Sequence, residues 1–227
     1  MNHTPALQNT IRKYQALLAT IDDWFNRCKT LSGNRIHCVA GCSACCRGLF
    51  DITLLDAFLL QTGFSQLPEN RRQAIRLKAE GRLRQLRTEW PDLHHPFLLN
   101  HLPDELWTEM PEDDETPCPL LDERGVCLIY DYRPMICRTH GLPNIDSSGE
   151  SFSDLCCTLN FPNDDPLLAE ELRWPFRRAF EQELVLFEEF TRQLLGASVR
   201  EADTFIPLAL LIDFSALSAN PPSNRFP

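Results

Sequence analysis

Four cysteines crowd into nine positions of the sequence, in the segment CVAGCSACC, as Cys38, Cys42, Cys45 and Cys46. Cysteine thiolates bind zinc and iron strongly, and the Cys42-x-x-Cys45 spacing is typical of a zinc knuckle or of a corner of an iron–sulfur cluster. On a helix all four would share one face, where small thiols could instead pack as apolar side chains. A stripe made only of cysteine fills a core poorly beside Leu or Ile, so the spacing favours a metal site.

The adjacent pair Cys45 and Cys46 indicates that one mononuclear site does not use all four thiols. Neighbouring side chains diverge, by about 100° on a helix or to opposite faces of a strand, so two adjacent cysteines rarely ligate one ion together. One of the pair is expected to serve a second ion or another edge of a cluster. Further ligands must then come from elsewhere, and Cys118, Cys127 and Cys137 are the obvious suppliers.

Taken together, these motifs resemble the YkgJ-type cysteine-cluster proteins. The resemblance rests on C-x-x-x-C-x-x-C-C, on CPLL…GVC-x-IY-x-x-RP-x-x-CR and on a later C-x-LNF, and it covers roughly residues 38–161. It implies a zinc- or iron-chelating domain of a family often labelled iron–sulfur oxidoreductases. Carried over by position, its eight cysteines give the expected metal ligands: Cys38, Cys42, Cys45, Cys46, Cys118, Cys127, Cys137 and Cys157. Cys157 is chosen over Cys156 because Thr158-Leu159-Asn160-Phe161 follows it, which leaves Cys28 and Cys156 as ordinary thiols.

Several metal centres are compatible with eight thiolates. They could form two zinc sites of four cysteines each, one dinuclear site, or one [4Fe–4S] cluster with spare thiols. A four-cysteine site carries net negative charge, so nearby cations should stabilise it. Arg133 and Arg138 are expected to do so as counterions or as donors to sulfur, with a surface salt bridge as the alternative. His140 could replace a cysteine, but a capping or exposed histidine is the stronger expectation.

The leading function is therefore the binding of an iron–sulfur cluster or zinc, with a redox role alongside a protein or small-molecule redox partner. A structural zinc protein that acts through partner contacts is the main alternative. A third reading is an enzyme, because flagellin lysine N-methylases carry a related cysteine-rich region and that resemblance implies methyl transfer from S-adenosylmethionine. The sequence offers no glycine-rich nucleotide loop to support it, and catalytic residues stay unknown.

Composition limits the partners and the cellular compartment expected for this chemistry. The 227 residues carry 32 acidic and 22 basic side chains, a formal net charge of −10, so a nucleic-acid partner is not expected. The basic segment Arg71–Arg87 is interpreted as a solvated helix face that the acidic stretch Asp104–Glu115 partly neutralises. No secretory signal or membrane-spanning run is found, so a cytoplasmic location without a membrane partner is expected. That compartment keeps thiols reduced, which favours metal binding over disulfides.

The elements that must position the cysteines are predicted to be mostly helices. Apolar spacing predicts a helix over residues 4–30, a short helix capped by Thr53 and closed by Gly63, and a longer helix from Pro68 to about Trp90. A hairpin should join Cys118–Leu121 to Val126–Ile129 through Glu123-Arg124-Gly125. A helical turn should run from Pro134 to Gly141. A last helix carries a core-facing stripe, which Pro175 either kinks or begins: Leu172, Phe176, Phe180, Leu184, Phe187, Phe190 and Leu194.

These elements predict a mainly α fold, a single irregular helical domain with a small β-hairpin around a cysteine-ligated metal centre. Its expected parts are an N-terminal helix at 1–36, the cysteine-cluster region at 37–161, C-terminal helices at 162–215 on the same core, and a disordered tail at 216–227.

Overall fold

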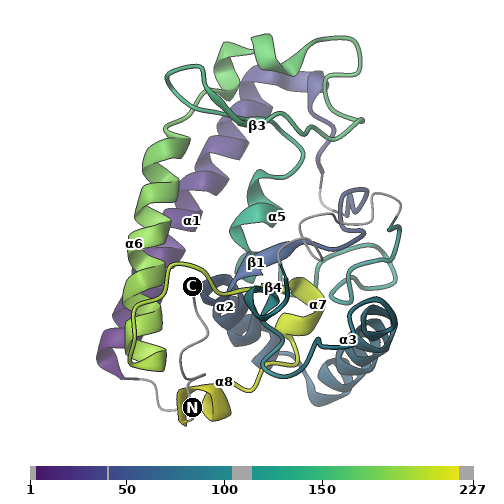
Figure 1. Ribbon diagram of the computed structural model, residues 1–227. Coiled ribbons are helices and arrows are strands. Elements are labelled where there is room, and N and C mark those ends of the chain that lie inside the picture. The colour runs from purple at the N-terminus through teal and green to yellow at the C-terminus, as the bar shows by residue number, and fades with distance from the viewer. Residues whose placement is uncertain (1–3, 40, 104–113, 220–227) are drawn as a thin grey trace.

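Two long helices, α1 (Pro5–Ser32) and α6 (Phe176–Leu195), run side by side along one edge of the computed structural model, which describes residues 4–39, 41–103 and 114–219 (Figure 1). The first helix begins as predicted, because the Thr4 hydroxyl accepts the Leu7 N–H at 3.2 Å. It ends at Gly33, whose φ of +56° lies in the left-handed region. Between the helices, the ring of Trp24 meets Phe176 edge-on at 4.9 Å, both buried in the core.

The apolar stripe predicted for α6 faces the core, with one exception. The helix begins directly after Pro175, so this proline marks its start rather than a kink, and it ends at the left-handed Gly196. Phe176, Phe187, Phe190 and Leu194 are buried, whereas Leu184 is 45% exposed. Leu172 is buried too, but in the short helix η5 (Glu170–Leu172), which follows η4 (Pro166–Leu168).

Two further helices, α2 (Leu54–Ser65) and α3 (Glu69–Glu89), follow one another in the chain. Thr53 caps α2 as predicted, accepting the Asp56 N–H at 3.1 Å. The prediction that Gly63 closes α2 is wrong, because this glycine lies inside the helix. A Cβ at Gly63 would come within 2.5 Å of Cγ of Tyr132, so the glycine permits close packing of η3 (Tyr130–Tyr132) on α2.

The basic face of α3 is partly neutralised by the acidic segment that follows it. Arg82 forms an ion pair with Asp114, with only 14% and 10% of the two side chains exposed. Glu115 lies 3.7 Å from Arg47, which is outside α3, so the neutralisation of α3 itself rests on the Arg82 pair. The rest of the predicted acidic stretch, residues 104–113, lies outside the described residues.

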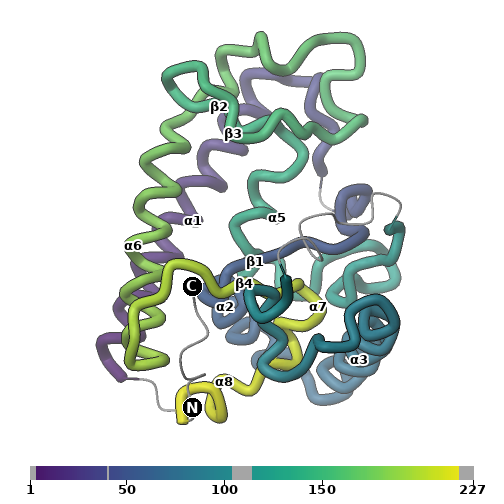
Figure 2. Tube along the Cα trace, viewed as in Figure 1, coloured from purple at the N-terminus to yellow at the C-terminus, as the bar shows by residue number. Residues whose placement is uncertain are grey.

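Two small antiparallel sheets tie distant segments together. Strand β1 (Asp51–Thr53) pairs with β4 (Asp203–Phe205), and β2 (Asn144–Ile145) forms a hairpin with β3 (Ser151–Ser153). Figure 2 shows this hairpin at the end of the molecule where α1 ends and α6 begins. The Trp174 N–H donates to the Ile145 carbonyl at 3.0 Å, which fixes the hairpin to the chain entering α6.

The hairpin predicted between Cys118 and Ile129 is reduced to one isolated bridge, between Leu121 and Cys127. The expected first strand turns instead of extending, because the Leu121 N–H donates to the Cys118 carbonyl at 3.1 Å and Pro119 has no N–H. The turn itself is present: Gly125 adopts φ +76°, and its N–H donates to the Asp122 carbonyl at 3.1 Å.

The predicted mainly α fold with a small β-hairpin is confirmed. The remaining elements are short: η1 (Gly33–Arg35), η2 (Leu99–His101), α5 (Met135–Thr139), α7 (Ile206–Ala209) and α8 (Phe214–Ala219). One hydrophobic cluster includes Ile21, Ile129 and Phe190, so segments far apart in the chain share one core. Residues 216–219 end α8, and 220–227 lie outside the described residues. Across the part of the chain that is described, no helix is long and apolar enough to cross a membrane.

Candidate metal centre

The first cysteine segment is shaped by turns, not by a helix. The Cys42 N–H donates to the Val39 carbonyl at 3.0 Å, and the Cys46 N–H donates to the Ser43 carbonyl at 3.0 Å. Gly41 allows the first of these turns with φ +86°. The helical face considered from the spacing is therefore not what gathers these thiols. Two successive tight turns bring them together instead.

The second cysteine segment is hydrogen-bonded to the first. The Cys118 N–H donates to the Cys46 carbonyl at 2.9 Å, and the Gly48 N–H donates to the Thr116 carbonyl at 2.9 Å. A Cβ at Gly125 would lie 2.9 Å from Oγ of Ser43, so the turn before Cys127 packs against the turn that carries Cys42. Cysteines about 80 residues apart in the chain thus belong to one interlocked pair of loops.

The remaining expected ligands lie on either side of Gly141. Cys137 is in α5, which begins after Pro134. Gly141 has φ +105°, and its carbonyl accepts the Cys157 N–H at 3.2 Å. A Cβ on Gly141 would lie 3.7 Å from Sγ of Cys38 and 3.8 Å from Cβ of Cys157. Both are ordinary contacts, so it is the φ of +105° that favours glycine at this point between Cys38 and Cys157.

Seven of the eight expected ligands line one cavity of about 1520 Å³: Cys38, Cys42, Cys45, Cys46, Cys118, Cys127 and Cys137. Cys157 does not line it, although it lies beside Cys38. Among the described residues, no three His, Cys, Asp or Glu side chains converge closely enough to hold a metal ion. The donors fit a thiolate-bound metal in kind, and seven of them share one cavity, but they are not gathered into a ready ligand set.

Burial disfavours the thiolate form at several cysteines of this cavity. It raises the pKa of Cys118 to about 11, and it also raises the pKa values of Cys38, Cys127 and Cys137. The pKa of Cys45 is raised first by its hydrogen bond with Cys46 and then by burial. A metal ion must displace these protons, because the thiolate is the ligand.

Positive charge opposes this effect of burial at several of the thiols. Arg133 acts to lower the pKa values of Cys45, Cys127 and Cys137, so its guanidinium lies within electrostatic reach of all three. Lys78 of α3 acts in the same direction on Cys118. The cavity thus holds cations that favour the thiolate form of its cysteines.

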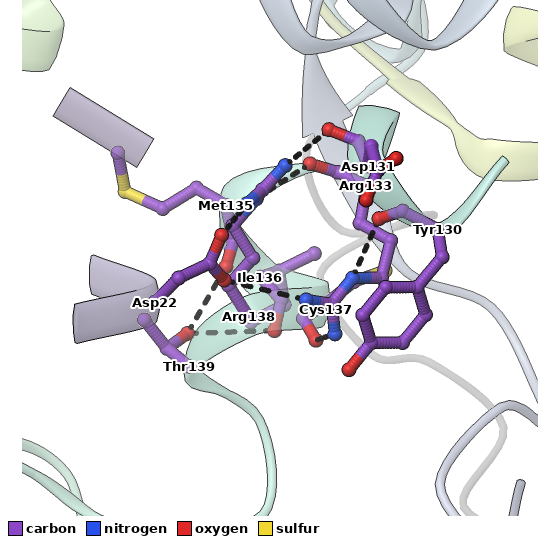
Figure 3. A network of polar contacts seen from close by, with 9 residues as sticks. All are labelled: Asp22, Tyr130, Asp131, Arg133, Met135, Ile136, Cys137, Arg138 and Thr139. Atoms are coloured by element: carbon purple, nitrogen blue, oxygen red, sulfur yellow. Dashed lines mark hydrogen bonds and ion pairs between the residues drawn. The ribbon is translucent and has the colours of Figure 1, made fainter. Parts of the chain in front are cut away.

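Arg133 and Arg138 belong to a polar network that joins α5 to α1 (Figure 3). The Arg138 side chain is 5% exposed and forms an ion pair with Asp22, and it donates to the carbonyls of Asp131 and Arg133 at 2.8 and 3.0 Å. Arg133 lies 3.6 Å above the Tyr130 ring and 3.3 Å from Asp22. Within the described residues, neither guanidinium donates to a cysteine sulfur. Their support of the metal ligands therefore stays a prediction. For Arg133, that support would come from its charge rather than from a hydrogen bond to sulfur.

Asn160 is a site residue that the sequence interpretation missed. Its Nδ2 donates to Sγ of Cys38 at 3.4 Å and to the Gly141 carbonyl at 2.7 Å, while its Oδ1 accepts the His37 N–H at 2.8 Å. Asn160 is only 4% exposed, and these contacts fix the orientation of its side chain. Asn160 is the asparagine of the C-x-LNF motif, so the signal lay in the residues that also place Cys157.

The two cysteines outside the expected ligand set differ in position. Cys28 is fully buried in α1, where its thiol contacts the Glu171 carbonyl at 3.4 Å and burial raises its pKa to about 11. Cys156 lies beside the centre, with its thiol 3.3 Å from the Gly141 carbonyl and a pKa that burial raises to about 11.

His140 also lines the cavity, but its ring packs edge-on against Phe50 at 5.0 Å.

The family model CxxCxxCC, described as "Putative zinc- or iron-chelating domain", matches residues 37–158, which is more than half of the chain. No curated protein matches the chain, and no solved structure does. The matched range contains all eight expected ligands.

Proposed function

This chain belongs to the CxxCxxCC family of zinc- or iron-chelating domains, and on that premise we propose that ligands drawn from its eight patterned cysteines hold an iron–sulfur cluster with a redox role. We place it in the cytoplasm, where thiols stay reduced and available to metal. Its reaction class would be that of an iron–sulfur oxidoreductase exchanging electrons with a protein or small-molecule partner.

One observation carries the proposal: cysteines from separated chain segments line a single cavity. Burying many polarisable thiols around open space gains less packing than burying aliphatic side chains there, so packing does not account for the arrangement. The turns at Gly41 and Gly125 pack the two cysteine loops against each other. A shared metal centre would give these separated segments a reason to place their cysteines around one cavity.

The openness of this cavity favours a working centre over a closed structural zinc site. Structural zinc is enclosed by four protein ligands, whereas a working centre keeps a face open to a ligand or partner. A cavity of about 1520 Å³ leaves room beyond any four-cysteine site. With Cys45 and Cys46 adjacent, one thiol could stay near the centre without being required to hold it.

An iron–sulfur cluster, when bound, would supply one-electron transfer at this position. The protein's own residues would set its environment. Asn160 would donate a hydrogen bond to the Cys38 sulfur, and hydrogen bonds to ligand sulfurs raise the reduction potential. Arg133 would offset the negative charge of the thiolates near Cys45, Cys127 and Cys137.

The test is the metal content of protein purified without oxygen. We expect a brown protein containing iron and acid-labile sulfide, with the colour lost in Cys42→Ser and kept in Cys28→Ser. Colourless protein that contains stoichiometric zinc and no sulfide would contradict the iron–sulfur assignment while leaving metal binding intact.

A structural zinc protein acting through partner contacts is the second candidate, and one observation favours it. Val39 and Leu155, the chain neighbours of Cys38 and Cys156, are 66% and 68% exposed, so each leaves an apolar side chain in solvent next to a cysteine segment. Stable zinc content with no redox signal, together with loss of a partner on Val39→Asp, would support this candidate.

A further inference from the structure

The helix α3 forms a wall of the cysteine-lined cavity that is entirely polar or glycine. Its lining residues recur over three turns and are Lys78, Gly81, Arg82, Arg84, Gln85 and Thr88. A helix face meant to pack against protein is apolar, as the buried positions Ile75, Ala79, Leu83 and Leu86 of the same helix are. The wall therefore faces open space and has the chemistry of a polar binding surface.

The cavity is basic in an acidic protein. Seven of its described lining residues are Lys or Arg and three are Asp, whereas the whole chain has 22 basic and 32 acidic residues. Several of these cations already have carboxylate partners, among them Arg82 with Asp114 and Arg138 with Asp22. Neither Lys78 nor Arg84 has an ion pair among the described residues. Lys78 donates to the Leu121 carbonyl at 3.4 Å.

Gly81 lies between these two cations and has no packing reason to be glycine. A Cβ there would meet a single atom among the described residues, a guanidinium nitrogen of Arg84 at 3.7 Å, which is an ordinary contact. Glycine inside a helix destabilises it relative to alanine. The residue therefore gives up helix stability and leaves the cavity wall bare of a side chain, so that a bound molecule could approach the helix closely.

From this arrangement we propose that the α3 wall binds a small anion, through carboxylate or phosphate oxygens held by Lys78 and Arg84 over Gly81, beside the cysteine loops. Lys78 reaches the loop that carries Cys118, so an anion held here would lie between α3 and the cysteines. The competing account is that these cations only balance the charge of the metal thiolates. Arg133 fits that charge-balancing role better than Lys78 or Arg84 does, because its charge acts on three of the thiols.

The test is calorimetric titration of the purified protein, with its metal content measured in the same sample. Inorganic phosphate and succinate are titrated separately at constant ionic strength. We expect one-to-one saturable binding of at least one of them. Binding of phosphate alone indicates a phosphate-bearing ligand, and binding of succinate alone indicates a carboxylate.

Three variants and one control locate the site. Lys78→Gln and Arg84→Gln should each weaken binding about tenfold or more, as expected for loss of a charge-assisted hydrogen bond. Gly81→Ala should weaken binding while raising the melting temperature. Arg71→Gln removes the same charge from an exposed position of α3 that does not line the cavity, and it should bind as the unaltered protein does.

Three results would overturn the proposal: no saturable binding of either anion, an equal loss in Arg71→Gln, or loss of bound metal from Lys78→Gln, which would make the cation a counterion of the centre. Anion binding by protein that lacks metal would uphold this site and contradict the proposed metal function, so the two failures are distinguishable.

Discussion

The amide of Asn160 donates a hydrogen bond to the sulfur of Cys38, with Nδ2 and Sγ 3.4 Å apart. The neighbouring contacts settle the direction of this bond. The amide oxygen Oδ1 accepts the His37 N–H, and Nδ2 also donates to the Gly141 carbonyl. The same side chain therefore binds the residue before Cys38, the Cys38 sulfur, and the glycine whose carbonyl also holds Cys157. It holds the two ends of the family motif together.

Asn160→Asp should weaken metal binding by about tenfold or more, the usual effect of altering a group that supports a ligand. The change replaces a donor with a negative charge next to a sulfur that must itself become negative. Competition with a chelator measures the affinity. Asn163→Asp is the matched control, since it makes the same charge change at an exposed position three residues away. Equal affinity in the two variants would show that the hydrogen bond has no influence on the metal.

A second prediction concerns a buried polar cluster behind α5. The Tyr14 hydroxyl lies 2.7 Å from Oδ1 of Asp56 and 3.2 Å from Oε1 of Glu183, and the same Asp56 oxygen accepts the Met135 N–H at the start of α5. A hydroxyl donates only one hydrogen, so one carboxyl must be protonated to complete the cluster. Desolvation raises the pKa of Asp56 to about 6 and that of Glu183 to about 8.

Because the pKa values of these two carboxyl groups are raised in the folded protein, their contribution to the free energy of unfolding should be fully present below about pH 4. That contribution should fall as the pH rises towards 8. Unfolding releases the retained protons over this window, with a slope of about 1.4 kcal/mol per pH unit for each proton. Asp203, whose pKa desolvation raises to about 6, adds to the fall below neutral pH. Glu183→Gln should remove much of the fall between pH 6 and 8 in urea unfolding, whereas the exposed Glu181→Gln should not. An unchanged pH profile in Glu183→Gln would refute the retained proton.

The two arginines of the RPMICR segment should have separable effects. Arg138→Ala removes the ion pair to Asp22 and leaves two carbonyl groups without a donor, so it should cost about 2 kcal/mol or more of unfolding free energy. Its effect on the reduction potential should be small. Arg133→Ala should shift that potential, because its charge acts on three cysteines.

Denaturant unfolding and voltammetry measure the two effects. Arg124→Ala serves as the control, since that side chain is 84% exposed. A potential shifted by Arg138→Ala and not by Arg133→Ala would reverse the assignment.

Removal of metal should loosen the cysteine loops before the helices. The loops at 38–48 and 118–141 are held by turns and by a few loop-to-loop hydrogen bonds, and metal binding of this kind is worth on the order of 10 kcal/mol. The packing of α1 against α6 contains no expected ligand. Hydrogen exchange after chelation should therefore rise in the loops and stay slow in α6. Equal exchange with and without metal in both regions would contradict this coupling.

The helices could be predicted from the sequence because local signals agreed with the tertiary structure. Thr4, Thr53 and Pro68 mark helix starts through interactions within a few residues, and the α6 stripe reports a buried face. The prediction that Gly63 ends α2 was wrong because the role of this glycine depends on Tyr132, about 70 residues away in the chain. The predicted hairpin failed because local turns around Pro119 competed with strand pairing.

The site shows the same division. Cysteine type and spacing predicted which thiols would gather, and seven of them line one cavity. The role of Asn160 depends on a contact between residues 122 positions apart in the chain, which no local pattern specifies. Likewise, the spacing of Arg138 from Cys137 suggested a partner of sulfur, whereas Asp22 of α1 takes up its guanidinium.

The most direct test of the metal centre is metal stoichiometry across single Cys→Ser variants purified without oxygen. The eight patterned cysteines are changed one at a time, with Cys28→Ser as the buried control outside the cavity and Cys156→Ser as the neighbour of Cys157. We predict that Cys42→Ser, Cys118→Ser and Cys137→Ser, from three different segments, each lose metal, while Cys28→Ser keeps it. Metal loss from Cys28→Ser equal to that from Cys42→Ser, or full retention in all three segment variants, would contradict a shared cysteine-ligated centre.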